Sequence, residues 1–137
     1  MRKVFDYCIF CYTSYNMKQK NLLQSFKYAF NGLRILLREE SNARIHLCIA
    51  FCVLIAGFVL RISKGEWIII IFCIGLVFAL ELLNTAIENM ADFVSKDYHV
   101  LIKKAKDLSA SAVLIGAITA AIIGFIIFAP RIIGLLY

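Results

Sequence analysis

Three long apolar runs constrain this chain more than any other feature. They extend from Ile45 to Leu60, from Trp67 to Leu83 and from Leu108 to Ala129, and only His46 and Glu81 interrupt the first two. A helix needs roughly 20 mostly apolar residues to cross about 30 Å of hydrocarbon. Because 62% of the 137 residues are hydrophobic, so small a chain would be unable to bury its apolar surface in water. We therefore predict an all-α membrane protein with three transmembrane helices.

Lysine and arginine are distributed unevenly around these runs. Eight lie at or before Arg44 and four lie between the second and third runs, whereas Arg61, Lys64 and Arg131 lie on the other side. Because positive residues favour the cytoplasmic side, we predict a cytoplasmic N-terminus and an external C-terminus. The net charge of +6 then follows from topology and anionic headgroups, and nucleic acid need not be invoked.

The segments that flank the runs set the expected helix boundaries. Residues 21–38 alternate polar and apolar side chains at steps of three and four, as in an amphipathic helix at the membrane surface. Ser63 and Glu66 have the spacing of a capping box, so the second helix is predicted to extend over residues 64–94. The other two spans are expected at about 45–60 and 108–129.

Residues 1–16 show neither pattern. We expect them to be a disordered extension, or the product of a start codon upstream of the natural one, ahead of a single domain formed by residues 17–137. Cys8 and Cys11 form an isolated C-x-x-C, which lacks the further ligands that a zinc site needs. No metal or redox role is expected for this pair.

The third run carries small residues at intervals of four. Gly116, Ala120 and Gly124 would share one helix face. Such a face allows two helices to approach closely within a membrane. We therefore predict close helix packing along it.

A stripe of polar residues at the end of the second run is the most informative feature. At about 100° per residue, four side chains share one face of a helix: Glu81, Asn84, Glu88 and Asp92. A carboxylate within hydrocarbon costs at least ~2.5 kcal/mol, so Glu81 is a candidate functional group, suited to act as a general base. Glu88, nearer water, suits a divalent cation. Alternatively, Glu81 pairs with a basic residue only to hold helices together.

Two charged clusters are predicted on the same side of the membrane as this stripe. One covers residues 38–46, and the other covers residues 97–107. Together they would bring cations for phosphate beside carboxylates for metal. The chain has neither a G-x-x-x-x-G-K-[ST] nor a G-x-G-x-x-G motif, which excludes the P-loop and protein-kinase architectures.

The stretch from Glu81 to Asp92 resembles the prokaryotic diacylglycerol kinase family, three-span membrane enzymes that include the undecaprenol kinases. It fits the family signature E-x-x-N-[ST]-[SA]-x-E-x-x-x-D. Tyr98-His99 and Ala105-Lys106-Asp107 follow at the family's spacing, and the resemblance covers residues 21 to about 129. It implies a lipid kinase of the bacterial inner membrane that uses ATP and Mg²⁺ at the cytoplasmic face. It also implies a homotrimer with active sites shared between protomers.

The resemblance implies a role for each matching residue. Glu81 would be the catalytic base toward the lipid hydroxyl, with Asn84 beside it, and Glu40 and Glu88 would hold the magnesium ion. The nucleotide would contact Tyr28, Glu40, Glu88, Asp97, Tyr98, His99, Lys106 and Asp107. The lipid would contact Glu81, Arg44 and Ala110.

Three departures from the family pattern bear on the lipid acceptor. Diacylglycerol-type members carry an arginine, an acidic residue and a serine where this chain has Asn21, His46 and Ala110. The sequence Arg44-Ile45-His46-Leu47 is similar to the polyprenol kinase branch instead. We therefore predict that undecaprenol is phosphorylated to undecaprenyl phosphate, with diacylglycerol, giving phosphatidic acid, as the alternative.

Two interpretations of other classes stay open at this point. A small transporter or ion-translocating subunit could use Glu81 as a proton carrier within the membrane, but it would have no need for the charged groups gathered around the stripe. A purely structural membrane protein would leave the stripe unexplained.

Overall fold

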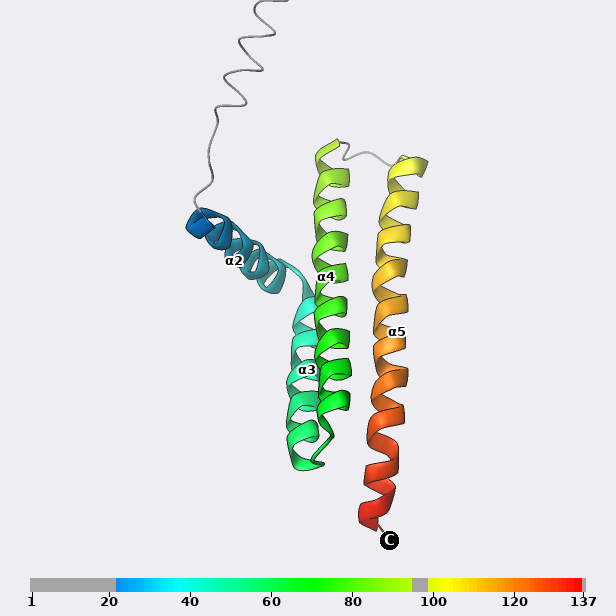
Figure 1. Ribbon diagram of the computed structural model, residues 1–137. Helices are drawn as coiled ribbons and strands as arrows, with labels where there is room; N and C mark the ends of the chain where they lie inside the picture. Colours follow the sequence, from blue (N-terminus) through cyan, green and yellow to red (C-terminus); the bar gives the residue numbers. More distant parts are fainter. Residues whose placement is uncertain (1–21, 95–98, 137) are drawn as a thin grey trace, which may run out of the picture. The chain divides into compact units, whose positions relative to one another are not determined.

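The computed structural model describes residues 22–94 and 99–136, and these residues are all-helical, as predicted (Figure 1). The helices are α2 (Leu22–Glu39), α3 (Ser41–Val59), α4 (Lys64–Val94) and α5 (Val100–Leu136). The predictions for residues 1–16, and those for Asp97 and Tyr98, fall outside the described residues.

The chain forms two compact units whose boundary lies between Arg34 and Ile35, within α2. In the first unit, residues 22–34 are helical, with apolar and polar side chains alternating at helical spacing. The second unit contains the end of α2 together with α3, α4 and α5.

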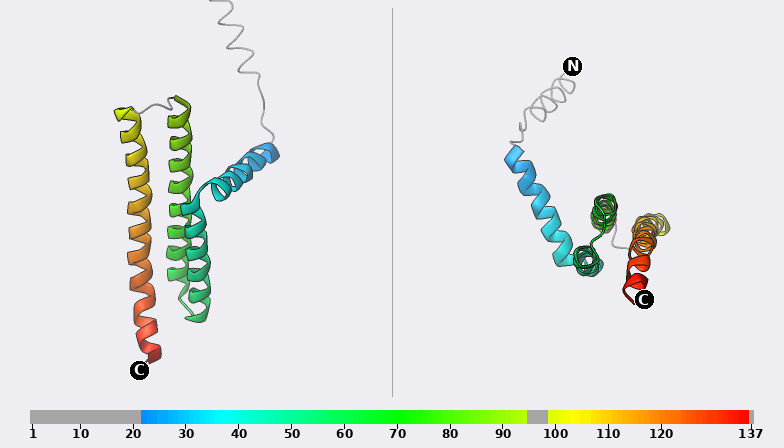
Figure 2. Two further views of the ribbon diagram at one scale, coloured as in Figure 1. Left: turned by 180° about the vertical axis from the view of Figure 1, so that it is seen from behind. Right: turned by 60° about the horizontal axis from the view of Figure 1, so that its bottom comes forward.

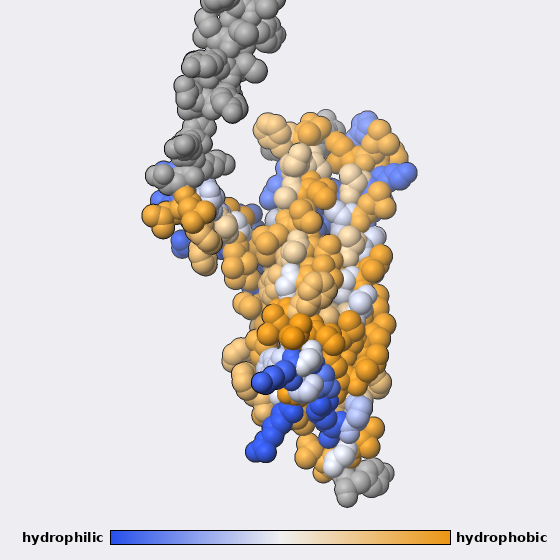
Figure 3. Space-filling model, viewed as in Figure 1, coloured by the Kyte–Doolittle hydropathy of each residue, from blue (hydrophilic) through white to orange (hydrophobic). Residues whose placement is uncertain are grey.

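Three helices of the second unit are long and apolar enough to cross a membrane: α3, α4 and α5. Only 17%, 33% and 17% of the residues in their most apolar windows are buried within the protein. A soluble bundle would turn such side chains inward, so lipid is the solvent that accounts for their exposure. Figure 3 shows hydrophobic side chains over most of the visible face of these helices, with hydrophilic ones gathered toward their ends.

Helix α4 is central, because it packs against α5 on one side and against α3 on the other (Figures 1 and 2). Ile62, Ile70 and Ile127 form a buried cluster there. Gly116 of α5 lies so close to α4 that an added Cβ would be 2.6 Å from the Leu80 side chain, which confirms the predicted close packing at this position. At Gly124 an added Cβ would meet no atom of the described residues within 4 Å, so close packing at this position stays a prediction.

A capping box begins α4, as predicted. The Ser63 backbone N–H donates to Glu66 Oε2 over 2.7 Å, and the Glu66 N–H donates to Ser63 Oγ over 3.4 Å. The guanidinium of Arg131 also donates two hydrogen bonds to the Glu66 carboxylate, at 2.8 and 2.7 Å. The end of α5 is therefore tied to the beginning of α4, opposite the end of α4 that carries the polar stripe.

Helices α3 and α5 extend beyond the bounds predicted from their apolar runs. Helix α5 covers Val100–Leu136 where residues 108–129 were predicted, and α3 begins at Ser41 where residue 45 was predicted. An apolar run marks the depth of hydrocarbon, whereas a helix continues into the charged interface for as long as its backbone remains bonded. The extension of α5 places Lys106 beside Asp92, near the end of α4.

Candidate active site

The predicted polar stripe occupies the buried face of α4. This face carries Ile70, Cys73 and Val77 at steps of three and four and continues into Glu81 and Asn84. Glu81 is 2% exposed and Asn84 8% exposed, Glu88 is half-buried, and Asp92 is exposed. The stripe therefore passes from the interior of the helix group toward water along one helix face, as the helical period predicts.

Glu81 lies beside a histidine from the neighbouring helix. His46 Nε2 of α3 is 3.3 Å from Glu81 Oε1, yet the two atoms are not joined by a hydrogen bond, and this oxygen is buried without a hydrogen-bond partner. The carboxylates of Glu40 and Glu88 also lie within electrostatic range of Glu81. Glu81 thus contacts an imidazole but keeps an oxygen that can accept a proton from a further group.

Asn84 is held in one orientation by two hydrogen bonds. Its Nδ2 donates to Glu88 Oε1 over 2.9 Å, and its Oδ1 accepts from the Ser109 hydroxyl of α5 over 2.7 Å. If the amide were reversed, its oxygen would face the carboxylate and its NH₂ would face the hydroxyl proton. These two hydrogen bonds, from Ser109 to Asn84 and from Asn84 to Glu88, therefore determine which carboxylate oxygen of Glu88 remains available to another ligand.

A second contact between α4 and α5 lies nearer water. Lys106 Nζ is 2.6 Å from Asp92 Oδ1. Lys106 and Ser109 are three residues apart, so both lie on the face of α5 that meets the polar stripe. A phosphate group near this site would compete with Asp92 for the Lys106 ammonium.

The described residues also include the predicted nucleotide contacts Tyr28, His99 and Asp107. The His99 Nδ1 accepts from the Leu101 backbone N–H over 3.3 Å, so this imidazole caps the beginning of α5. The Asp107 side chain is exposed. Tyr28 belongs to the first unit and is not placed relative to the stripe.

The remaining candidates lie on α3 and α5. Glu40 is half-buried between α2 and α3. Arg44 is exposed and its guanidinium donates to the Arg38 carbonyl over 3.3 Å. Ala110 is exposed, and α5 presents its neighbour Ser109 to Asn84.

The acidic residues suit a magnesium ion held jointly with a nucleotide. Among the residues that the structure describes, no three His, Cys, Asp or Glu side chains gather closely enough to enclose a metal. Mg²⁺ is commonly bound through only one or two carboxylates, with substrate phosphates and water as its other ligands. Glu40 and Glu88, which both lie within electrostatic range of Glu81, are the candidates for such a pair, and the Asn84 amide occupies only Oε1 of Glu88.

Sequence reasoning missed two hydroxyl groups. Ser109 has a recognisable signal, because it follows the predicted nucleotide contact Lys106 by one helical turn. Thr85 lies within the family signature, is 6% exposed, and has a hydroxyl oxygen with no hydrogen-bond partner. The sequence gives no signal for Thr85, because only the structure shows that its hydroxyl is buried without a hydrogen-bond partner.

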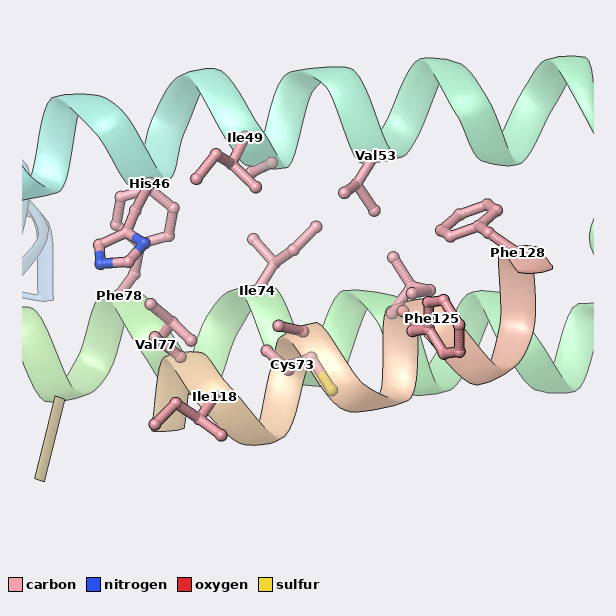
Figure 4. Close-up of a pocket in the computed structure, with 16 residues that line it drawn as sticks. His46, Ile49, Val53, Cys73, Ile74, Val77, Phe78, Ile118, Phe125 and Phe128 are labelled. Carbon is pink, nitrogen blue, oxygen red and sulfur yellow. The ribbon is translucent and has the colours of Figure 1, made fainter. Parts of the chain in front are cut away.

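An apolar groove of about 670 Å³ lies between α3, α4 and α5. His46 stands toward one end and Phe128 toward the other (Figure 4). The other lining side chains are apolar or weakly polar, among them Ile49, Val53, Ile74, Val77 and Phe125. His46 also contacts Glu81, so one imidazole joins this end of the groove to the carboxylate at the buried end of the stripe.

Comparison with known proteins identifies the family. The profile of prokaryotic diacylglycerol kinase matches residues 27–128. The chain is 44% identical to the undecaprenol kinase of Bacillus subtilis over 80% of its own length and 89% of the relative's. It is 38% identical to a diacylglycerol kinase of Synechocystis, with 85% and 67% covered, and 32% identical to the diacylglycerol kinase of Escherichia coli, with 74% and 83% covered.

The residues that match the family profile, 27–128, include the polar stripe, the groove lining, and Lys106 and Ser109 of α5. Family membership favours the kinase over the transporter and structural interpretations. The chain belongs to the prokaryotic diacylglycerol kinase family of membrane lipid kinases, and ATP is its co-substrate.

Proposed function

We propose that this lipid kinase transfers the γ-phosphoryl group of ATP to the hydroxyl of undecaprenol, giving undecaprenyl phosphate. The observation that carries the choice of acceptor is the groove that ends at His46, because its lining offers almost no hydrogen-bonding groups to a lipid. A polyprenol is a bare alcohol on a branched apolar chain, whereas diacylglycerol carries ester carbonyls beside its hydroxyl. Such carbonyls would lose their hydrogen bonds in an apolar lining.

The relatives support the same acceptor. The relative named undecaprenol kinase shares 44% of its aligned residues with this chain, compared with 38% and 32% for the two diacylglycerol kinases described above. Ala110 adds to this preference, since it provides no hydrogen bond where the diacylglycerol-type members carry a serine. Arg44 lies in the first turn of α3, within the charged cluster of residues 38–46. There it would contact the lipid near its hydroxyl.

Glu81 is the base in the proposed reaction. The lipid hydroxyl would donate its proton to the buried carboxylate while the hydroxyl oxygen attacks the γ-phosphorus. The new O–P bond forms as the bond between the γ-phosphorus and the β,γ-bridging oxygen breaks, and ADP leaves with that oxygen. Oε1 of Glu81, which accepts no hydrogen bond within the described residues, is the atom suited to receive the proton.

The half-buried carboxylates and the cations hold the nucleotide. Glu40 and Glu88 would bind Mg²⁺, which neutralises charge on the β- and γ-phosphates. Lys106 would exchange Asp92 for a phosphate oxygen. Further nucleotide contacts are assigned by family resemblance to Tyr28, Asp97, Tyr98, His99 and Asp107.

The reaction is proposed to occur at the cytoplasmic face of the bacterial inner membrane, with the N-terminus inside and the C-terminus outside. The excess of lysine and arginine beside the polar stripe supports this orientation. The amphipathic helix α2 would lie in a membrane interface. A homotrimer with shared sites would cover the exposed side of the groove, since three helices leave it open.

The acceptor is tested by kinetics with two lipids in identical detergent micelles. Purified protein should show a higher kcat/KM for undecaprenol than for dioleoyl glycerol, at the same mole fraction of lipid and at saturating ATP and Mg²⁺. A ratio that favours dioleoyl glycerol would assign the chain to the diacylglycerol branch. Absence of transfer to either lipid would contradict both assignments.

A further inference from the structure

Two buried oxygen atoms on α4 lack the hydrogen bonds that such atoms ordinarily make. Among the residues that the structure describes, they are Glu81 Oε1 and Thr85 Oγ1. The two residues are one helical turn apart, and they are 2% and 6% exposed. Buried polar atoms without partners are rare in proteins, and they are often completed by a ligand or a water molecule.

The Thr85 hydroxyl could have been satisfied by its own helix. On α5, Thr119 Oγ1 donates to the Ile115 carbonyl over 2.8 Å, and Ser111 Oγ donates to the Asp107 carbonyl over 2.7 Å. These bonds to the carbonyl four residues earlier are the usual solution for a hydroxyl within a helix. Thr85 makes no such bond, so its hydroxyl remains able to bind another group.

The neighbouring helix provides no partner for Thr85. Helices α3 and α4 are antiparallel (Figure 1), and His46 contacts Glu81. Three residues back from His46 along α3 and four residues forward from Glu81 along α4 lead in the same direction, to Ala43 and to Thr85. Ala43 is completely buried, and its methyl group cannot form a hydrogen bond.

The position of Thr85 along α4 indicates which group its hydroxyl binds. Thr85 lies between Glu81, the proposed base, and Glu88, the proposed metal ligand. In phosphoryl transfer the acceptor oxygen must lie between the group that takes its proton and the phosphate that it attacks. The unpartnered hydroxyl is therefore located at the level of the acceptor oxygen.

We propose that Thr85 is a substrate-binding residue whose hydroxyl donates a hydrogen bond to the hydroxyl oxygen of the lipid acceptor. The acceptor O–H donates to Glu81, one lone pair of its oxygen accepts from Thr85, and the other attacks the γ-phosphorus. Thr85 keeps its own proton throughout, while the acceptor proton moves to Glu81 and ADP leaves. This inference rests on the proposed function, and it adds a specific contact for the alcohol group that any lipid acceptor shares.

The test compares Thr85→Val, Thr85→Ser and Thr119→Val in the full chain, with undecaprenol and dioleoyl glycerol as acceptors. Thr85→Val keeps the side-chain shape but removes the hydroxyl, so kcat/KM for the better acceptor should fall about threefold to tenfold, the scale of one lost hydrogen bond. KM for ATP should change less than twofold. Thr85→Ser should recover most of the lost rate, and Thr119→Val should match the parent.

Thermal unfolding in detergent distinguishes this role from a structural one. Because the Thr85 hydroxyl is unpartnered before lipid binds, Thr85→Val should leave the midpoint of unfolding unchanged or raise it. A lowered midpoint, or an equal loss toward ATP and lipid, would show that the hydroxyl bonds within the protein or to another subunit, and would overturn the proposal. So would kinetics of Thr85→Val equal to those of Thr119→Val.

The same assays separate this proposal from the proposed function. If the parent transfers phosphate and Glu81→Gln abolishes the transfer while Thr85→Val behaves as the parent, only the Thr85 assignment fails. If the parent transfers phosphate to neither lipid, the proposed function fails as well.

Discussion

Ser109→Ala removes the donor that holds the Asn84 amide, and its effect can be estimated from the structure. The Ser109 oxygen is 2.7 Å from Asn84 Oδ1 and 2.9 Å from the Lys106 carbonyl, and its single proton can serve only one of them at a time. Asn84 is 8% exposed, so water has little access to its oxygen. Leaving a buried acceptor unsatisfied costs about 1–3 kcal/mol.

The loss should reach Glu88 through the amide. If Asn84 rotates to find another donor for its oxygen, its Nδ2 leaves Glu88 Oε1, and the proposed metal ligand is no longer oriented. We expect phosphoryl transfer to fall about tenfold, equivalent to about 1.4 kcal/mol. The Mg²⁺ concentration at half-maximal rate should rise as well.

Ser111→Ala is the matched control for this change. The Ser111 hydroxyl is exposed and donates only to the Asp107 carbonyl of its own helix, so its removal should change stability by no more than about 0.5 kcal/mol. Both variants would be assayed with γ-labelled ATP and undecaprenol over a series of Mg²⁺ concentrations. Equal rates and equal Mg²⁺ midpoints for the two variants would refute the positioning role of Ser109.

Three further predictions concern the metal, the far end of the helices and the N-terminal segment. Glu40→Ala and Glu88→Ala should each raise the Mg²⁺ concentration at half-maximal rate about tenfold or more, whereas titration of Glu39→Ala, the exposed neighbour, should overlay the parent. Arg131→Ala should lower the thermal midpoint in detergent without changing KM for ATP, because it breaks the two hydrogen bonds to the Glu66 carboxylate far from the stripe; an unchanged midpoint would contradict this. A chain that begins at Met17 should insert and phosphorylate lipid as the parent does, and loss of activity would reveal a role for the preceding residues.

The helices were predictable wherever a local signal fixes them. The capping box of Ser63 and Glu66 set the beginning of α4, and the observed helix, Lys64–Val94, has the predicted bounds. For α5 the apolar run indicated only the part expected within hydrocarbon. The charged residues before it carry no local signal that distinguishes a helix from a loop, so the observed beginning at Val100 was not predicted.

The candidate site was predictable along α4 but not across helices. The helical period alone placed Glu81, Asn84 and Glu88 on one face, and the structure confirms that face through its graded burial. Contacts between helices depend on how the helices pack, which no local pattern specifies. For that reason the sequence did not reveal the bond between Ser109 and Asn84, and it did not reveal that the Thr85 hydroxyl would be buried without a partner.

Glu81→Gln tests the central claim most directly. The measurement is the initial rate at which label moves from γ-labelled ATP to undecaprenol, for parent and variant purified in the same detergent. The amide keeps the volume of the side chain but cannot accept the proton as a carboxylate does, so the rate should fall by about 10² or more while the assembly of the protein is unchanged. A variant that assembles normally and transfers phosphate at a rate within twofold of the parent would contradict the account.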